Sequence, residues 1–290
     1  MVQPLTTDQI RSFDTDGYLH LRKWIPEDLL RQLQQAADAA IQKGLREFHD
    51  ACLDSRVCIV LSGASPFVIR INDLVFDPNP VFMDLLGSPY ITEVAESLAG
   101  HHCLPTYEAL VIKNKGDDQM IEWHRDLEQE RTGRLLTVGV YLDESVRGNG
   151  ALRIIPASQN SPDDVCELRE KLEAGQVSAV EIETEPGDVL IHDVMALHAS
   201  GALTDQVLRR TIYFEFRPEA LVHANPLFSP AWQALRRRQM ELARERWVQR
   251  GSRPTGMDGW SAEELEFIAQ LKTVEKGLEA GHYCYRPLSE

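Results

Sequence analysis

The stretch EPGDVLIHDVMALHASGALTDQVLRRTIYFEFRP, residues 185–218, alternates short apolar runs with turn residues and carries two histidines. It predicts a strand that ends near His192, a second apolar element that contains His198, and a β-branched and aromatic strand that begins near Arg209. Short strands separated by turns in this way are typical of a sandwich or barrel and not of alternating βαβ units.

The same pattern of short apolar runs separated by turn residues begins at about residue 106, with runs such as PTYEALVIKNK and RLLTVGVYLDE. One insert, SPDDVCELREKLEAGQ, predicts a short helix between strands. Before residue 106 the periodicity predicts helices, the first with a Thr6/Gln9 capping box and the second after Pro26. Residues 53–79 are undecided. The expected class is α+β, with a mainly β core flanked by helices.

Helix returns after Pro218. A basic segment with six arginines between residues 236 and 250 precedes an acidic one with a Ser261/Glu264 capping box. We interpret the two as solvated faces, with a cover over the active site or a dimer contact as the alternative. The expected organisation is one domain over residues 1–217 and a helical extension, residues 218–290, packed on it.

Composition restricts the partners. The 290 residues include 30 basic and 45 acidic ones, and the net charge of −15 predicts no nucleic-acid or membrane partner. The N-terminus is polar and no run of apolar residues is long enough to span a bilayer, so a cytoplasmic protein, monomer or homodimer, is expected. Five scattered cysteines without CxxC pairing predict reduced thiols, with neither a disulfide framework nor a cysteine-based zinc site.

The segment IEWHRDLEQE, residues 121–130, contains His124 and Asp126 two positions apart. In a strand these side chains share one face, roughly 7 Å apart at their Cα atoms, and both can reach one metal ion. A third ligand must come from a distant strand, and His198 is the first candidate with His192 as its rival. Two histidines and a carboxylate form the facial triad of non-haem Fe(II) oxygenases. A zinc hydrolase with the same ligands and a non-catalytic jelly-roll binding protein are the alternatives.

Four stretches in this order resemble the phytanoyl-CoA dioxygenase family of Fe(II)- and 2-oxoglutarate-dependent oxygenases. They are LTTDQIRSFDTDGYLHLRKWIPEDLL, WHRD, NGALRIIPAS and GDVLIHDVMALHASG, and the resemblance covers roughly residues 5–217. It implies a double-stranded β-helix, or jelly roll, with iron near one open end. One turn departs from the family pattern, with Ala157 in place of glycine and Gln159 in place of histidine.

The resemblance also implies roles for single residues: His124, Asp126 and His198 as iron ligands, Arg209 as the clamp on the distal carboxylate of 2-oxoglutarate, and Ser200 and Lys113 as further contacts to that co-substrate. A guanidinium fork suits a carboxylate, since it donates two parallel hydrogen bonds. The adjacent Arg210 should point to the opposite face of the strand.

The activity implied is hydroxylation of an unactivated C–H bond of a small-molecule substrate, with Fe(II) as cofactor, 2-oxoglutarate and O2 as co-substrates, and succinate and CO2 as products. Desaturation or cyclisation by the same site, as in natural-product biosynthesis, is the alternative reaction. Arg70 and Arg153 are candidates to bind an anionic group of the substrate if they face the mouth of the roll, because buried charges are rare without such a partner.

Overall fold

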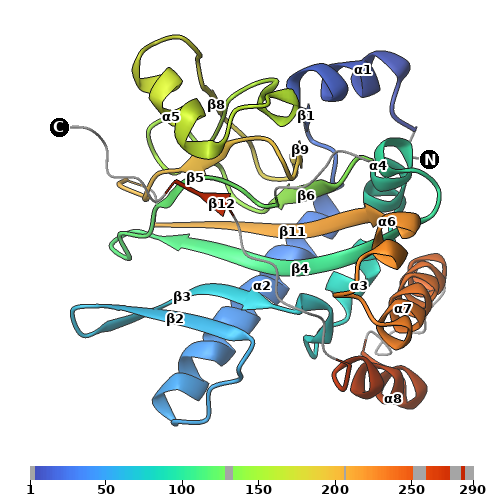
Figure 1. Cartoon of the computed structure of the whole chain (residues 1–290). Helices are drawn as coiled ribbons and strands as arrows, with labels where there is room; N and C mark the ends of the chain where they lie inside the picture. The colour runs from blue at the N-terminus through green and yellow to red at the C-terminus, as the bar shows by residue number, and fades with distance from the viewer. Residues whose placement is uncertain (1–3, 128–132, 206, 251–258, 275–281, 285–290) are drawn as a thin grey trace.

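Two antiparallel sheets form the core of the protein in the computed structural model, which describes residues 4–127, 133–205, 207–250, 259–274 and 282–284. The larger sheet has the order β1-β9-β6-β11-β4-β3-β2 and the smaller one β12-β5-β10-β7-β8 (Figure 1). This is the jelly roll that the sequence predicts. The strands of the larger sheet are β1 (Tyr18–Leu21), β2 (Val57–Ser62), β3 (Ser65–Asn72), β4 (Cys103–Asn114), β6 (Leu136–Tyr141), β9 (Val189–Asp193) and β11 (Leu208–Pro218). Those of the smaller sheet are β5 (Ile121–Arg125), β7 (Leu152–Ile154), β8 (Val180–Ile182), β10 (His198–Ser200) and β12 (His282–Tyr283).

Helices precede, interrupt and follow the strands as expected. The predicted capping boxes of α1 and α8 are present, and α5 has one as well, which was not predicted from the sequence. The helices are α1 (Thr7–Asp16), α2 (Glu27–His49), α3 (Val81–Leu86), α4 (Pro89–Ala99), α5 (Val165–Glu173), α6 (Glu219–Ala224), α7 (Pro230–Gln249) and α8 (Ala262–Leu271), with short 3-10 turns η1 (Leu74–Phe76) and η2 (Ser158–Asn160). The last part of the acidic segment, residues 275–281, lies outside the described residues.

The hydrophobic core lies between the larger sheet and the helices α2 to α4. Alternation along β11 decides which side chains enter it, because successive residues of a strand point to opposite faces. Ile212 and Phe214 are fully buried in this core, whereas Arg209 and Tyr213 line the cavity on the other face. Burial of each large apolar side chain contributes about 1.5–3 kcal/mol, so the helix-covered face stabilises the sheet and leaves the opposite face available for polar groups.

The undecided segment 53–79 forms the hairpin of β2 and β3 and the turn η1. Strand β3 pairs with β4, so that Arg70 lies opposite Val111 and Asn72 opposite Ala109. The hairpin therefore extends the larger sheet at its edge, and Arg70 and Asn72 both line the cavity.

The turn that departs from the family pattern keeps a conformation that favours glycine. Ala157 has a φ of 64°, in the left-handed region, which is a strained choice for a residue with a Cβ. The amide of Gln159 donates to the carbonyl oxygen of Asp14 at 3.2 Å. Gly17 has a φ of 80°, in the left-handed region that favours glycine, and a Cβ there would lie 2.3 Å from the end of the Gln159 side chain. This turn thereby joins η2 to the end of α1.

The basic helix of the tail is only partly solvated, which corrects the interpretation of two solvated faces. Arg236 and Arg246 of α7 are buried, and each pairs with a carboxylate from a distant element. The reason is non-local, since Glu108 of β4 and Asp84 of α3 cannot be recognised as partners from the sequence. Helix α7 packs against α3 and β4, and α6 against β11. These contacts agree with an extension packed on one domain, although the boundary at residue 217 stays a prediction.

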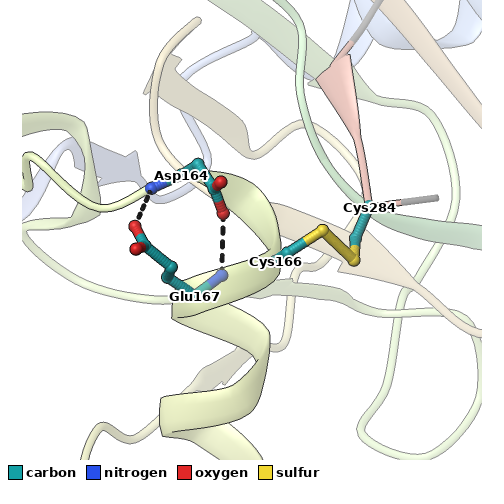
Figure 2. Close-up of a disulfide and its surroundings, with 4 residues drawn as sticks. All are labelled: Asp164, Cys166, Glu167 and Cys284. Atoms are coloured by element: carbon teal, nitrogen blue, oxygen red, sulfur yellow. Dashed lines mark hydrogen bonds between the residues drawn. A yellow bond between two sulfur atoms is a disulfide. The ribbon is translucent and has the colours of Figure 1, made fainter. Parts of the chain in front are cut away.

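The expectation of reduced cysteines alone is wrong for one pair. Cys166 at the start of α5 forms a disulfide with Cys284, with the two Cα atoms 4.8 Å apart (Figure 2). The two cysteines are 118 positions apart in the sequence, so their spacing does not indicate that they pair. Cys52, Cys58 and Cys103 are free thiols. Among the described helices, none is both long and apolar enough to cross a membrane.

Candidate metal centre and co-substrate site

Three of the predicted site residues meet on the smaller sheet. Strands β5 and β10 are antiparallel neighbours, and their register places His198 directly opposite His124. Asp126 is the first residue after β5 and lies two positions after His124. One ligand atom from each of the three residues lies within 4.8 Å of the other two. The structure therefore brings together the two-residue motif and a histidine that is 74 positions further along the chain.

Backbone carbonyls orient both imidazoles. Nδ1 of His124 lies 2.8 Å from the carbonyl oxygen of Glu122, and Nδ1 of His198 lies 2.9 Å from that of Ala196. Because a carbonyl oxygen only accepts, each Nδ1 carries the hydrogen and each Nε2 keeps its lone pair. Nε2 of His124 and of His198 lie 3.4 and 3.6 Å from Oδ1 of Asp126. Such second hydrogen bonds fix the tautomer of metal-binding histidines, so these donors fit a divalent metal ion.

The charges of the centre suit a metal ligand set. Burial raises the pKa of the Asp126 carboxyl, but the imidazoles of His198, His124 and His192 outweigh it and hold this pKa well below its usual range. Burial, and then the neighbouring His124, lowers the pKa of His198 to about 3. A carboxylate and a neutral imidazole are the protonation states that metal binding needs, so no proton has to be displaced at neutral pH.

His192, the rival third ligand, lies on the far side of the carboxylate. Its Nε2 is 3.2 Å from Oδ2 of Asp126, the oxygen that also accepts from the hydroxyl of Thr137 at 3.2 Å. His192 belongs to β9 of the larger sheet and is almost fully buried. His192 and Thr137 thus hold Oδ2, which leaves Oδ1 directed at His124 and His198. This arrangement supports His198 as the third ligand and His192 as a residue that orients Asp126.

Arg209 faces the same cavity as the three candidate ligands. It is 2% exposed, and its Nη1 donates to the carbonyl oxygen of Gly150, with the hydroxyl of Ser145 at 3.5 Å. Within the described part of the chain its Nε has no hydrogen-bond partner. A buried guanidinium with an unused donor in a cavity can receive a carboxylate.

Arg210 points to the opposite face, as expected from alternation. Its guanidinium donates to both carboxylate oxygens of Asp143 at 2.8 Å and to Asp38 of α2 at 2.6 Å. Arg210 is 6% exposed and forms ion pairs with both Asp38 and Asp143. Its role is to join β11 to α2.

Lys113 lies opposite Arg209 on β4 and is buried. Burial, and then the charge of Arg209, lowers the pKa of Lys113 to about 7. Its amine donates to the carbonyl oxygens of Gly201 at 2.7 Å, Gln119 at 3.0 Å and Ser200 at 3.4 Å. These contacts favour a supporting role behind Arg209, and a direct contact with 2-oxoglutarate stays a prediction. Ser200 itself lines the cavity.

The three candidate metal ligands, Arg209 and Ser200 line one cavity of about 1040 Å³. Arg70 lines it, whereas Arg153 lies outside it with its guanidinium 5.0 Å from the ring centre of Trp123. Sequence reasoning missed further lining residues. Alternation from Arg209 along β11 points to Glu215, but no local signal identifies those contributed by η1, α7 and the end of α8, namely Phe76, Trp232, Arg236, Leu271, Lys272 and Val274.

The jelly roll and the His124–Asp126–His198 cluster place the chain in the superfamily of non-haem Fe(II)- and 2-oxoglutarate-dependent oxygenases. The chain belongs to the phytanoyl-CoA dioxygenase (PhyH) family, whose model matches residues 13–211. A probable phytanoyl-CoA dioxygenase of Caenorhabditis elegans is 20% identical over an alignment of 278 residues, which covers 86% of this chain and 87% of that protein.

Two solved structures show the same fold. The crystal structure of EvdMO1 is 28% identical with a TM-score of 0.62 and covers 76% of this chain, while this chain spans only 50% of EvdMO1. The structure of EctD from S. alaskensis with 2-oxoglutarate and 5-hydroxyectoine is 25% identical with a TM-score of 0.62, over 75% of this chain and 77% of that one. The relatives differ in what their names say they act on, so they do not name the substrate here.

Proposed function

We propose that this protein is an Fe(II)- and 2-oxoglutarate-dependent hydroxylase of a small molecule. The observation that carries the proposal is that the oriented His124, Asp126 and His198 open into the same cavity as the buried guanidinium of Arg209. A zinc hydrolase needs the three metal ligands but has no use for the buried Arg209. A binding protein without catalysis needs neither the ligands nor this arginine.

In the proposed site His124, Asp126 and His198 hold the iron, and Arg209 binds the distal carboxylate of 2-oxoglutarate. When bound, Fe(II) supplies the activation of O2, in which 2-oxoglutarate becomes succinate and CO2 and one oxygen atom enters a C–H bond of the substrate. These three residues are the two histidines and one carboxylate that would hold Fe(II) in such an oxygenase. By the family resemblance, related halogenases lack this carboxylate, so the presence of Asp126 favours hydroxylation.

The protein's own part is positioning. The carbonyls of Glu122 and Ala196 fix the imidazoles, and Thr137 and His192 fix the carboxylate, so the ligands need little reorganisation on metal binding. Apolar side chains, among them Val111, Leu152 and Ala199, form part of the cavity wall. Arg209 is only 2% exposed, and this low exposure strengthens its contact with the carboxylate of the co-substrate.

An anaerobic titration tests the proposal. Addition of Fe(II) and then 2-oxoglutarate to the full chain should give a weak visible charge-transfer band at about 500 nm, because a 2-keto acid then chelates the iron. A chain that binds both without this band, or binds neither, is a hydrolase or a binding protein. Under O2, succinate release with a substrate that gains one oxygen atom supports hydroxylation. A substrate that loses two hydrogens supports desaturation or cyclisation.

A further inference from the structure

The C-terminal extension, residues 218–290, contributes part of the cavity wall. Trp232 of α7 and Leu271, Lys272 and Val274 at the end of α8 line the same cavity as the metal centre. All four residues follow the stretch that matches the family, which ends at residue 211. This wall therefore lies outside the part of the chain that the family model matches.

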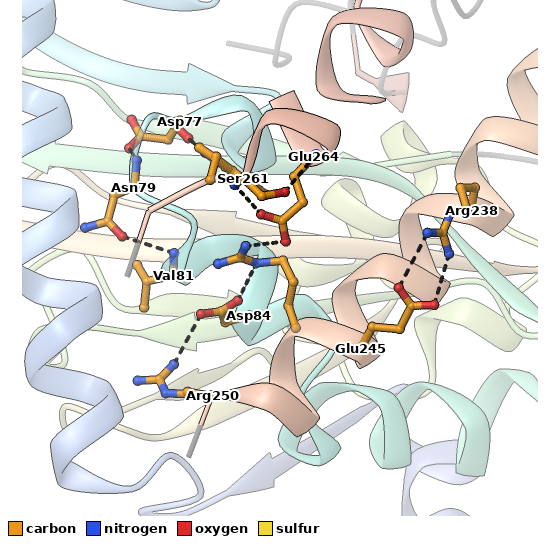
Figure 3. A network of polar contacts seen from close by, with 11 residues as sticks. Asp77, Asn79, Val81, Asp84, Arg238, Glu245, Arg250, Ser261 and Glu264 are labelled. Carbon is orange, nitrogen blue, oxygen red and sulfur yellow. Dashed lines mark hydrogen bonds and ion pairs between the residues drawn. The ribbon is translucent and has the colours of Figure 1, made fainter. Parts of the chain in front are cut away.

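A buried ionic network fixes that wall to the domain. Arg246 of α7, 1% exposed, donates to Asp84 of α3 at 2.7 Å and to Glu264 of α8 at 2.6 Å; Figure 3 shows these two acids on either side of the contact. The indole of Trp260 lies 4.6 Å from its guanidinium carbon and donates to the carbonyl oxygen of Asp77 at 2.9 Å. Loss of one partner from such a buried pair is costly, so the start of α8 is held in place.

Two of the four cations that line the cavity beyond Arg209 are neutralised inside the protein. Arg217 donates to Glu215 at 2.8 Å, and Arg236 donates to Glu108 at 2.6 Å. Both pairs are buried, so a carboxylate of the protein already compensates the charge of each guanidinium.

The other two cations have no such partner. Neither Arg70 of β3 nor Lys272 forms an ion pair with any residue of the described part of the chain, and both are exposed at the cavity. The ammonium of Lys272 lies 5.4 Å from the ring centre of Phe76, which follows β3. Asp73 and Glu122 also line the cavity, and of these Asp73 has an interaction partner.

In a chain with a net charge of −15, an anion is repelled at long range unless local cations receive it. We propose that the primary substrate is an organic anion, a carboxylate or phosphate ester on an aromatic or apolar body, whose negative group binds Arg70 and Lys272. The body of the substrate then lies against Phe76, Tyr107 and Trp232, which line the same cavity. This inference rests on the proposed function, because only an enzyme has a substrate. Its test measures binding and needs neither iron nor turnover.

Ligand-observed NMR on the full chain with Zn(II) and saturating 2-oxoglutarate, which keeps Arg209 occupied, tests this. The probes are two matched pairs, phenylacetate with phenylacetamide and phenyl phosphate with phenol. The wild type should bind at least one anion more tightly than its neutral partner, and the stronger pair distinguishes a carboxylate from a phosphate. Arg70→Gln and Lys272→Gln should each weaken that anion about two- to fivefold, and the double variant about tenfold, because each removes one exposed charge contact.

The matched control is the double variant Arg22→Gln and Lys115→Gln, which removes two exposed cations outside the cavity and should keep the preference for the anion. No preference in the wild type, or an equal loss in the control, overturns the proposal. The proposal is also overturned if Arg70→Gln and Lys272→Gln change the affinity for 2-oxoglutarate but not that for the anionic probes, since the two cations then attract the co-substrate. Failure of the proposed function appears separately, as the absence of the visible band.

Discussion

Replacement of Arg209 by alanine removes the proposed clamp on 2-oxoglutarate. The side chain is 2% exposed, so a carboxylate bound to it is shielded from water and stays shielded when the guanidinium is lost. Loss of a charge-assisted contact to a desolvated partner costs about 1.4–4 kcal/mol, which corresponds to a Kd for 2-oxoglutarate raised roughly 10- to 1,000-fold. Arg209→Lys should recover part of this loss, because one ammonium cannot reproduce the fork.

The structure adds a second effect. Nη1 of Arg209 donates to the carbonyl of Gly150, so the alanine variant also leaves that buried acceptor without its donor, which costs about 1–3 kcal/mol of folding stability. Binding must therefore be measured at a temperature where the variant is folded. Anaerobic titration of the visible band with 2-oxoglutarate gives Kd without turnover and without knowledge of the substrate.

The neighbouring arginine provides the decisive comparison. Arg210 is buried and pairs with Asp143, which is 17% exposed, and with Asp38, which is 63% exposed. Arg210→Ala should therefore lower the free energy of unfolding by about 3 kcal/mol and leave the Kd for 2-oxoglutarate of the folded protein within about threefold. Arg22→Ala, at an exposed position, is the control for both measurements. The reasoning is refuted if Arg210→Ala weakens 2-oxoglutarate more than Arg209→Ala does.

Three further predictions concern the metal centre, the disulfide and the buried lysine. His192→Ala should keep iron but bind it about 10- to 100-fold more weakly, because it frees Oδ2 of Asp126, and complete loss of iron in an equilibrium dialysis would make His192 a ligand. The denatured, unreduced chain should show three thiols to Ellman's reagent and five after reduction, whereas five in both cases would exclude the Cys166–Cys284 bond. Because the pKa of Lys113 is lowered to about 7, the unfolded state binds more protons than the folded state above that pH. Between pH 7 and pH 9 the free energy of unfolding of the wild type should rise by roughly 2 kcal/mol relative to that of Lys113→Met, as measured by chemical denaturation. A difference that stays constant with pH would contradict this.

Local patterns in the sequence determined a large part of the fold and of the site. Capping boxes at Thr6 and Ser261 marked helix starts, because the contacts they make span three residues. The spacing of His124 and Asp126 predicted that both side chains can reach one metal ion, and alternation put Arg209 and Arg210 on opposite faces. Such features depend on backbone geometry within a few residues, so the sequence alone is sufficient for them.

Only the tertiary structure decided between groups whose partners are far away in the chain. The sequence made His198 the first candidate for the third ligand and left His192 as its rival. The strand register sets His198 opposite His124, and His192 lies behind Asp126. The burial of Arg246, the Cys166–Cys284 bond and the arrival of Lys272 in the cavity have no local signal either. A buried charge is stable only beside its counter-charge, and that counter-charge is chosen by packing between distant segments, which no pattern of neighbouring residues encodes.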